Sequence, residues 1–227
     1  MTNQEIYQAL KQDILTIKLK PGQMISENEV AGTYSVSRTP VKSAFIRLEN
    51  EGFIEVIPQK GTMVTLIDYK HICDTIYMRY VLELDMINTI IRDFTEKELE
   101  KLLKALDTNL KEQKRLASRK KTEPTMFYEL DNQFHHLMFS HTNKEHIWTI
   151  IQDTEVYYTR FRLLDTKATA RYDELYKEHV ELVQAIKERN ATAAQRALHD
   201  HLHKILSLFV RATLDEYKDY LINYDIK

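Results

Sequence analysis

The sequence predicts a mainly α-helical protein with two domains: a small N-terminal domain that ends in a β-hairpin, and an all-α antiparallel bundle of about six helices. Three observations support this prediction. All four glycines and three of the four prolines lie in the first 61 residues. The following stretch, residues 62–227, has no glycine and a single proline, so it is poor in turn-forming residues and is expected to be helical. The length of 227 residues suffices for two hydrophobic cores, and we expect domains of residues 1–67 and 68–227.

The first two helices of the N-terminal domain are predicted from apolar spacing and from a cap. Ile6, Leu10 and Ile14 recur at helical intervals and form one apolar stripe. A capping box then opens a second helix, with Ser26 at the N-cap and Glu29 three residues later. We therefore expect two short helices, followed by a turn at residues 32–35.

A third helix is expected to start after Ser37, where Pro40 is tolerated because the first turn of a helix needs no internal N–H bond. Its buried face is expected to comprise Val41, Ala44, Phe45 and Leu48. Two strands, at residues 53–57 and 62–66, then flank a turn at residues 58–61. Three helices followed by a hairpin are typical of a winged helix-turn-helix domain.

The polar face of the third helix predicts contact with double-stranded DNA. The N-terminal end of a recognition helix enters the major groove, where Arg38 can donate two hydrogen bonds to guanine. Hydroxyl groups and free N–H groups at the start of a helix suit phosphate oxygens. Taken singly, these residues read as an ordinary solvated surface, whereas their joint order favours DNA binding. The candidate contacts are Ser37, Arg38, Thr39, Lys42 and Arg47 in the helix, with Lys60 and Gly61 at the tip of the wing.

Several short motifs of the first domain occur together in one order. They are Pro21-Gly22, Ser26-Glu27, Val36 to Val41, Arg47-Leu48, Glu51-Gly52 and Gly61. The segment that they span, about residues 5 to 66, resembles the GntR family of bacterial transcriptional regulators. The resemblance implies DNA contacts from Arg38, Thr39, Lys42 and the wing at Lys60-Gly61. Asn28 and Lys42 stand where arginine is common in the family, and lysine lacks the planar fork that reads a base with two hydrogen bonds.

The second domain is expected to contain six helices, at about residues 69–93, 96–118, 123–141, 144–164, 168–188 and 191–222. Asp131 and His135 are four residues apart and share one helix face among apolar residues, while His179 and His201 each lie in register with an apolar stripe. A carboxylate and three imidazoles that converge in a helical bundle form a credible site for a divalent transition metal. The competing interpretation is that each histidine is a satisfied core residue, and spacing alone does not decide between the two.

A second set of motifs covers about residues 70 to 210. The set is Arg79-x3-Glu83, Asp131-x2-Phe134-His135, Asn143, Glu178-His179 and Ala-Leu-x2-His201-Leu202. It resembles the FCD effector domain of the FadR-like group of GntR regulators. The resemblance implies that a zinc, nickel or manganese ion is bound by Asp131, His135, His179 and His201. It also implies that Arg79 pairs with a small organic acid, and Arg160, which borders the same bundle, is a weaker candidate for holding this anion.

These features predict a ligand-responsive transcriptional repressor and not an enzyme. The predicted partners are a small carboxylate effector, a palindromic DNA operator and a second copy of the chain, because one short recognition helix reads few base pairs. Two alternatives stay open. One is a metal-dependent enzyme of the hydrolase type, since His199-Asp200 resembles the dipeptide of helical metal-dependent phosphohydrolases. The other is a DNA-binding protein whose metal site is purely structural.

Composition bears on the location of the protein more than on its partners. The formal net charge is −2, so no basic excess points to nucleic acid. No apolar run approaches the roughly 20 residues of a membrane span, and the first residues lack the apolar core of a signal peptide. The single cysteine, Cys73, suits a reducing compartment. We therefore expect a cytoplasmic protein without a membrane span.

Overall fold

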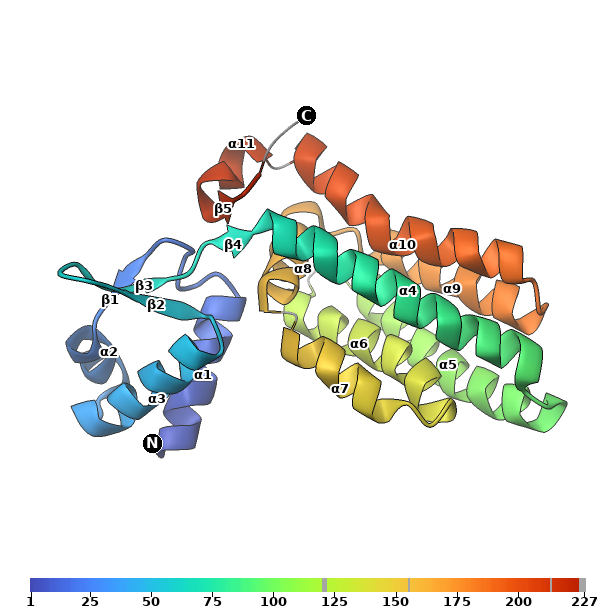
Figure 1. Ribbon diagram of the computed structural model, residues 1–227, viewed down its shortest axis with the longest axis horizontal. Helices are drawn as coiled ribbons and strands as arrows, with labels where there is room; N and C mark the ends of the chain where they lie inside the picture. The colour runs from blue at the N-terminus through green and yellow to red at the C-terminus, as the bar shows by residue number, and fades with distance from the viewer. Residues whose placement is uncertain (120–121, 155, 213, 225–227) are drawn as a thin grey trace. The chain divides into compact units, whose positions relative to one another are not determined.

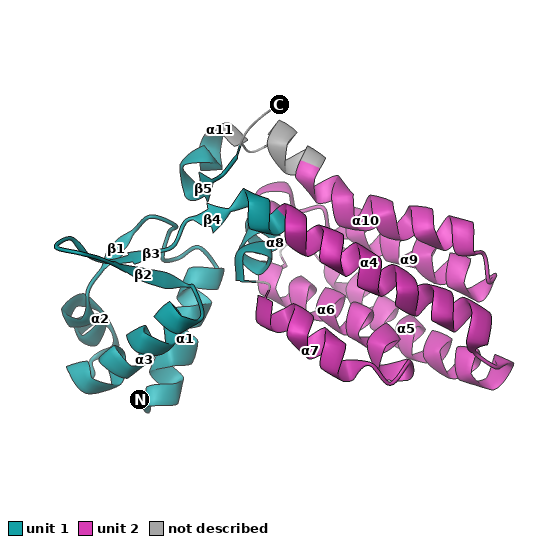
Figure 2. Cartoon of the chain, viewed as in Figure 1, with its two compact units in different colours: residues 1–72, 156–164, 214–227 teal, residues 73–155, 165–213 magenta. Residues whose placement is uncertain are grey.

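The computed structural model describes residues 1–119, 122–154, 156–212 and 214–224. Lys120, Lys121, Glu155, Thr213 and residues 225–227, which belong to the predicted C-terminal domain, lie outside the described residues. The chain forms two compact units (Figure 2). Unit 1 contains Met1–Ile72, Val156–Leu164 and the described residues from Leu214 onward. Unit 2 contains the described residues of 73–155 and 165–213. Three segments of the predicted second domain therefore belong to unit 1, at residues 68–72, 156–164 and from 214 onward.

The N-terminal part of unit 1 is a winged helix-turn-helix. Its elements are α1 (Asn3–Leu15), β1 (Met24–Ile25), α2 (Glu27–Tyr34), α3 (Arg38–Asn50), β2 (Ile54–Ile57) and β3 (Gly61–Val64) (Figure 1). The strands form an antiparallel sheet in the order β1-β3-β2. The predicted fold class is confirmed, and the structure adds the two-residue strand β1 at the edge of the wing.

The helices of this domain bury the apolar faces that their spacing predicts. Ile6, Leu10 and Ile14 of α1 are at most 1% exposed. They share one core cluster with the buried face of α3, which comprises Val41, Ala44, Phe45 and Leu48. Full burial of one aliphatic side chain contributes about 1.5–3 kcal/mol. The cluster therefore fixes α3 on α1 and, with it, the face of α3 that points to solvent.

The N-caps of α2 and α3 differ. Ser26 accepts a hydrogen bond from the backbone N–H of Glu29 (3.2 Å) and donates its hydroxyl to the carboxylate of the same residue (2.9 Å). Ser37 occupies the N-cap of α3, but within the described residues its side chain makes no capping hydrogen bond. The first turn of α3 therefore presents its hydroxyl and backbone N–H groups at the surface.

The wing turns at residues 58–60, between Ile57 and Gly61, which pair across the hairpin. Gly61 has a φ of 119°, a backbone conformation that residues with a side chain rarely adopt. A Cβ atom there would also lie 3.2 Å from the end of the Met24 side chain on β1. Glycine at this position therefore permits both the turn and the close approach of the edge strand.

The chain segment after the wing pairs with the segment that precedes the C-terminus. β4 (Ile67–Asp68) lies parallel to β5 (Leu221–Ile222), and the Asn223 amide donates to the Asp68 carboxylate at 2.9 Å. The helix expected at residues 191–222 is therefore shorter than predicted. In its place are α10 (Ala191–Ala212), α11 (Leu214–Tyr217), a 3₁₀ turn (Lys218–Tyr220) and β5.

Unit 2 is a bundle of antiparallel helices. The helices that contribute to it are α4 (Tyr69–Asp93), α5 (Glu96–Ala117), α6 (Pro124–His141), α7 (Glu145–Thr154), the end of α8 (Val156–Thr169), α9 (Tyr172–Lys187) and α10. α9 packs on α10, and α5 packs on both α6 and α9 (Figure 1). The helix predicted at residues 144–164 corresponds to α7 and α8, which lie on either side of Glu155, a residue outside the described ones. None of the described helices combines the length and the apolarity that crossing a membrane requires.

Candidate functional site

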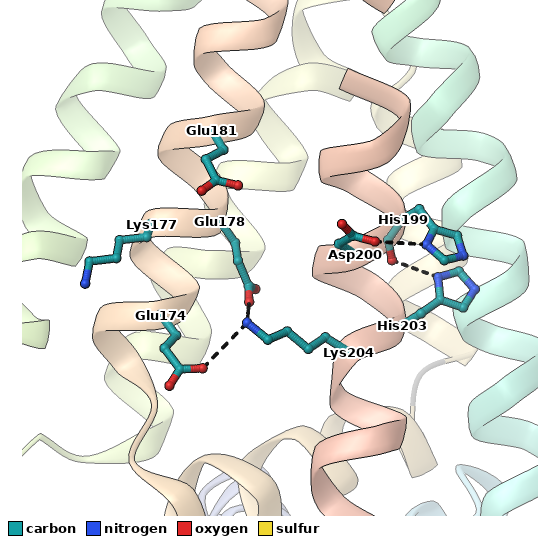
Figure 3. A pocket seen from close by; sticks show the side chains of 8 residues that line it. All are labelled: Glu174, Lys177, Glu178, Glu181, His199, Asp200, His203 and Lys204. Carbon is teal, nitrogen blue, oxygen red and sulfur yellow. Dashed lines mark hydrogen bonds and ion pairs between the residues drawn. The ribbon is translucent and has the colours of Figure 1, made fainter. Parts of the chain in front are cut away.

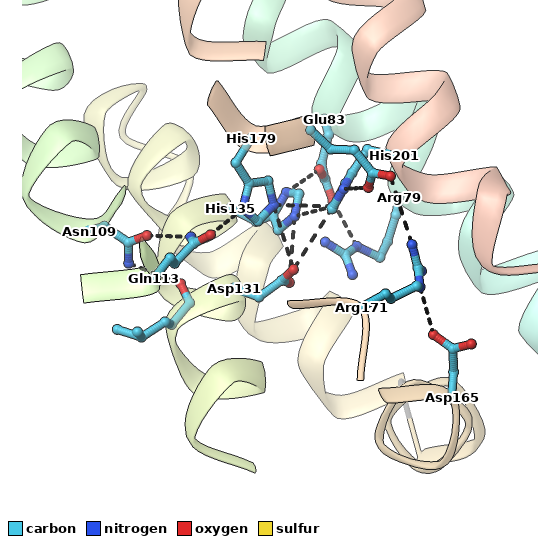
Figure 4. A network of polar contacts seen from close by, with 12 residues as sticks. Arg79, Glu83, Asn109, Gln113, Asp131, His135, Asp165, Arg171, His179 and His201 are labelled. Carbon is cyan, nitrogen blue, oxygen red and sulfur yellow. Dashed lines mark hydrogen bonds and ion pairs between the residues drawn. The ribbon is translucent and has the colours of Figure 1, made fainter. Parts of the chain in front are cut away.

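The four predicted metal ligands meet inside unit 2 (Figure 4). Asp131 and His135 lie on α6, His179 on α9 and His201 on α10. All four are buried, and one ligand atom from each lies within 4.8 Å of the others. The Nε2 atom of His201 is 3.2 Å from Nε2 of His135 and 3.3 Å from Nε2 of His179. One oxygen of Asp131 is 3.6 Å from Nε2 of His135, and the other is 3.6 Å from Nε2 of His179. We call these four residues the Asp/His group.

Each imidazole of the Asp/His group is oriented by an oxygen atom next to its Nδ1. The pairs are His135 with Glu83 (2.6 Å), His179 with Gln113 (2.8 Å) and His201 with Glu178 (3.0 Å). Carboxylate and amide oxygens only accept hydrogen bonds, so each Nδ1 carries the proton and donates it. Each Nε2 is then left with a lone pair that points into the group.

The orientation of the Gln113 amide is set by two further contacts within unit 2. Its Nε2 donates to Oδ1 of Asn109 at 2.7 Å, and Nδ2 of Asn109 donates to the backbone oxygen of Leu130 at 2.9 Å. The amide oxygen of Gln113 is therefore the atom that faces His179. A carbonyl of α6, the helix that carries Asp131, thus fixes the tautomer of a histidine on α9.

The two glutamates that hold Nδ1 atoms stay ionised although they are buried. Burial alone would raise the pKa of Glu83, but the charge of Arg79, together with the hydrogen bonds from His135 and Arg79, lowers it to about 2. Arg79 donates from Nε to Glu83 at 2.7 Å. Burial likewise opposes ionisation of Glu178, yet the hydrogen bond from His201 brings its pKa below the usual value. Both glutamates are therefore anionic acceptors.

The Asp/His group fits a single divalent transition-metal ion. Burial lowers the pKa of His135 against the opposing effect of Glu83, and the neutral imidazole is the form that binds metals. Three lone pairs and a carboxylate that face one another at 3.2–4.0 Å repel unless a cation lies between them. Ligand atoms that are each about 2.0–2.2 Å from one ion are roughly 3–4 Å from one another. The donors are thus of the right type at the right spacing.

A chain of ion pairs continues from the Asp/His group to α8 (Figure 4). Glu178, which holds His201, lies 2.8 Å from Nζ of Lys204 and 3.8 Å from Nη1 of Arg171. Figure 4 labels Arg171 and Asp165 of this chain of ion pairs. Nε of Arg171 lies 3.0 Å from the carboxylate of Asp165, near the end of α8. The charge of Glu178 is therefore balanced by two cations, each of which is also paired with another acid, since Nζ of Lys204 lies 3.6 Å from the carboxylate of Glu174.

The sequence motifs include Glu83 and Glu178 but assign them no function, and they do not include Gln113. A signal in the sequence could have identified Glu83 and Gln113 as site residues, because each is a polar residue in the buried stripe of its helix. Glu83 is separated by four residues from Ile87 of α4, and Gln113 follows Leu110 of α5 by three. A buried polar residue requires a hydrogen-bonding partner, which makes such positions candidates for a site.

The two arginines predicted to hold an effector lie in different units. Arg79 of unit 2 is fully buried, and its guanidinium lies 5.6 Å from the ring centre of Trp148. Arg160 of unit 1 donates from Nη1 to Oγ1 of Thr65 (2.9 Å) and from Nη2 to its backbone oxygen (2.6 Å). Burial lowers the pKa of Arg160 to about 10. Arg160 therefore holds the segment that follows β3, while Arg79 belongs to the surroundings of the Asp/His group.

The predicted DNA contacts form an exposed surface of unit 1. Ser37, Arg38, Thr39 and Lys42 on α3 are exposed, as are Lys60 and Gly61 at the tip of the wing. Nη2 of Arg38 lies 3.1 Å from the carboxylate of Glu27 on α2. Arg47 is also exposed, but its guanidinium lies 3.6 Å from the ring centre of Tyr7 on α1 and its Nε is 3.0 Å from Glu51. Arg47 thus braces α3 against α1.

The His199-Asp200 dipeptide, on which the enzyme alternative depends, lies on the exposed surface of α10. Neither residue is part of the Asp/His group. His201 follows them directly, but it points into the bundle and is 6% exposed. The dipeptide therefore does not supply ligands to the buried site.

Comparisons with known proteins agree with both parts of the chain. Residues 2–64 match the family described as bacterial regulatory proteins, gntR family, and residues 74–204 match the FCD domain. The chain is 30% identical over 218 residues to the HTH-type transcriptional repressor RspR of Escherichia coli (strain K12), which covers 96% of this chain and 92% of that protein. It is 23% identical over 204 residues to the gluconate operon transcriptional repressor of Bacillus subtilis (strain 168), with 86% of this chain and 80% of that one covered.

Solved structures share the fold. That of E. coli McbR/YncC superimposes with a TM-score of 0.64 at 18% identity and covers 92% of this chain and 97% of its own. The matches to both family models and to RspR along nearly the full length of each protein agree with the winged helix-turn-helix of unit 1 and the bundle of unit 2. The chain therefore belongs to the GntR family of DNA-binding transcriptional regulators and carries an FCD domain.

Proposed function

We propose that this protein is a homodimeric repressor that senses a small carboxylate at a metal-containing Asp/His group and thereby controls its binding to a palindromic operator. The observation that carries the proposal is the convergence of three imidazole Nε2 atoms and one carboxylate in a buried place. Each histidine donates its Nδ1 proton to an acceptor outside the group. The Nε2 lone pairs therefore face one another, and a cation between them would be their binding partner. Zinc, nickel and manganese are the candidate ions, because imidazole and carboxylate donors suit them.

A carboxylate effector follows from the number of donors and from the charges. Four protein donors leave coordination positions of an octahedral ion open, and a bound ion would offer these to a carboxylate oxygen. The positive charge of Arg79 neutralises the negative charge of Glu83. A divalent ion together with the carboxylate of Asp131 would leave a net charge of +1 in the Asp/His group. A monoanionic carboxylate restores neutrality in this buried region, where an uncompensated charge is costly.

Arg79 is the first candidate for contacting the effector. It is a fully buried cation, and it is bonded to the glutamate that holds the His135 ring. Arg160 is given a structural role in this proposal because both of its Nη atoms donate to Thr65. One relative carries the name gluconate operon repressor, which supports including sugar acids among the carboxylates to be tested.

On DNA, we assign base reading to Arg38, whose side chain is 67% exposed at the start of α3. Ser37 and Thr39 are assigned to phosphate oxygens, and Lys42 to a phosphate or a single base atom, because an ammonium group lacks the planar fork of arginine. Lys60 and Gly61 are assigned to the DNA that flanks the major groove. Arg47 is assigned to holding α3 in place beside the DNA backbone. A dimer would present two copies of this surface to two half-sites.

A thermal-shift screen tests the effector assignment. Metal-free and metal-loaded protein are each mixed with sugar acids, hydroxy acids, dicarboxylates and fatty acids. We expect one class to raise the midpoint only when metal is present, because a ligand at about 100 times its Kd stabilises the folded state by about 2.7 kcal/mol. Equal stabilisation of the metal-free protein would contradict the proposal. Turnover of the acid would favour an enzyme, and bound metal without any carboxylate response would indicate a purely structural ion.

A further inference from the structure

We infer that His199 and His203 on α10 form a second, exposed binding site for a divalent transition-metal ion such as nickel, zinc or copper. The two residues are four positions apart, so they lie one turn apart on the same face of the helix. Paired histidines at this spacing on a helix are a known arrangement for zinc ligands. His201 lies between them in sequence but faces the bundle interior, so this exposed pair is separate from the Asp/His group.

The two rings are held in parallel. Their centres are 4.2 Å apart and their planes differ by 15°. Tyr80 of α4, also in unit 2, contacts both rings edge-on, with ring centres 5.6 Å from His199 and 5.5 Å from His203. The Tyr80 hydroxyl in turn accepts a hydrogen bond from Gln195 of α10 at 3.2 Å. Tyr80 therefore contacts both rings from one side. The Nε2 lone pair lies in the plane of each ring, so the two near-parallel rings must turn from this stacked arrangement to bind one ion together.

Both Nδ1 atoms are occupied by the hydrogen bonds that metal-binding histidines usually make. Nδ1 of His203 lies 2.9 Å from the backbone oxygen of His199, and Nδ1 of His199 lies 3.3 Å from the carboxylate of Asp200. These acceptors place the proton on Nδ1 and leave the lone pair on Nε2, as in the buried site. Within the part of the chain that the structure describes, both Nε2 atoms have no protein partner.

His199 and His203 are among the residues that line a surface groove between α9 and α10. Figure 3 shows the two imidazole rings on the side of α10 that faces away from the charged side chains of α9. The charged residues of this groove are Glu174, Glu178, Glu181 and Asp200 against Lys177 and Lys204, so carboxylates outnumber ammonium groups by two. An excess of negative charge raises the local concentration of cations. Two imidazoles select borderline transition metals over magnesium or calcium, which prefer oxygen ligands.

The test is a nickel titration by equilibrium dialysis of the full chain, stripped of metal beforehand, with bound metal measured by elemental analysis. We expect wild type to bind about one more ion per chain than the variant His199→Asn/His203→Asn, because two imidazoles are lost together. The variant should keep its fold, since the side chain of His199 is 53% exposed and that of His203 is half-buried. His146→Asn, at an exposed histidine on α7, is the matched control and should bind as much nickel as wild type.

The same titration separates this site from the buried one. Trp148 is the single tryptophan, and its ring centre lies 6.4 Å from that of His135, so its fluorescence reports on the Asp/His group. The double variant should retain the full Trp148 response to nickel while its ion count falls. If the ion count of His199→Asn/His203→Asn equals that of wild type, the exposed site does not exist. If nickel does not change the Trp148 fluorescence of wild type, but wild type still binds one more ion than the double variant, the buried site is refuted and the His199/His203 site is supported.

Discussion

In the Asp/His group, the hydrogen-bond acceptor at Nδ1 of each histidine determines that Nε2 is the atom available to a metal. An imidazole with an acceptor at Nδ1 keeps its proton there and directs the Nε2 lone pair inward. Glu83 and Glu178 perform this role as anions, and Gln113 performs it as a neutral amide. Gln113 is therefore the acceptor that can be removed without changing any charge around the site.

Replacing Gln113 by leucine should weaken metal binding by about 10–100-fold, the usual effect of losing a partner of a metal-binding histidine. The fold should persist, because position 113 continues the buried leucine stripe of α5. Competition with a chelator, followed by Trp148 fluorescence, measures the affinity. Gln184→Leu, on α9, removes a glutamine whose side chain bonds only to Glu188 among the described residues and serves as the control. Unchanged affinity in Gln113→Leu would show that the His179 tautomer does not depend on this hydrogen bond.

Arg38→Ala should weaken binding to the operator by about 1–3 kcal/mol, the value of one bidentate contact with guanine. The side chain is 67% exposed, so stability should stay within about 0.5 kcal/mol of wild type. Fluorescence anisotropy with operators mutated one base pair at a time measures the effect. Arg92→Ala, at a 70% exposed arginine at the end of α4, is the matched control. A loss of equal size on every operator, including those that lack guanine, would assign Arg38 to phosphate and not to a base.

The placement of Asp131 and His135 together on one buried helix face could be predicted from the sequence, whereas the acceptors at the histidine Nδ1 atoms could not. Asp131 and His135 share a helix face among apolar residues, and a local pattern of that kind is visible in one segment. Gln113 faces His179 across 66 positions of the chain, and the pairing of Glu83 with His135 joins two different helices. Such contacts arise from the packing of α4, α5, α6 and α9, which helical periodicity alone does not specify.

At the scale of the elements, helices were predicted well where one apolar stripe continues and poorly where the backbone finds a distant partner. α1 and α3 bury the residues that their spacing indicates. Residues 218–222, by contrast, were expected to be helical and form a 3₁₀ turn and β5. The backbone of Leu221 pairs with Ile67, and this tertiary hydrogen bonding outweighs local helix propensity.

Arg160→Met tests whether α8 stabilises the segment after the wing. The substitution removes two hydrogen bonds from the charged guanidinium to Thr65 and also removes a buried charge. We expect the loss of the hydrogen bonds to dominate, so that unit 1 becomes about 1–3 kcal/mol less stable. Urea unfolding followed by circular dichroism measures the change in midpoint. Arg196→Met, at an exposed position of α10, should leave the midpoint unchanged. A midpoint equal to or above that of wild type for Arg160→Met would mean that the burial cost of the guanidinium dominates.

At the scale of the whole molecule, the chain passes from one unit to the other within α4 and within α8. α8 carries Arg160 within unit 1 and Asp165 within unit 2, and Asp165 ends the chain of ion pairs that starts at His201. A regulator needs only about 1–3 kcal/mol of coupling between effector and DNA, which is comparable to one or two charged hydrogen bonds. α8 makes contacts of this strength in each unit, through Arg160 with Thr65 in unit 1 and through Asp165 with Arg171 in unit 2.

The measurement that tests the central claim most directly is the metal content of the chain purified without chelators and dialysed extensively. We predict about one tightly held divalent transition-metal ion per chain, bound by the four buried donors. The variant Asp131→Ala/His179→Ala should lose this ion, and circular dichroism checks that it remains folded. A wild-type chain without any bound transition metal, or a folded variant that retains as much as wild type, would contradict the assignment of the Asp/His group as a metal centre.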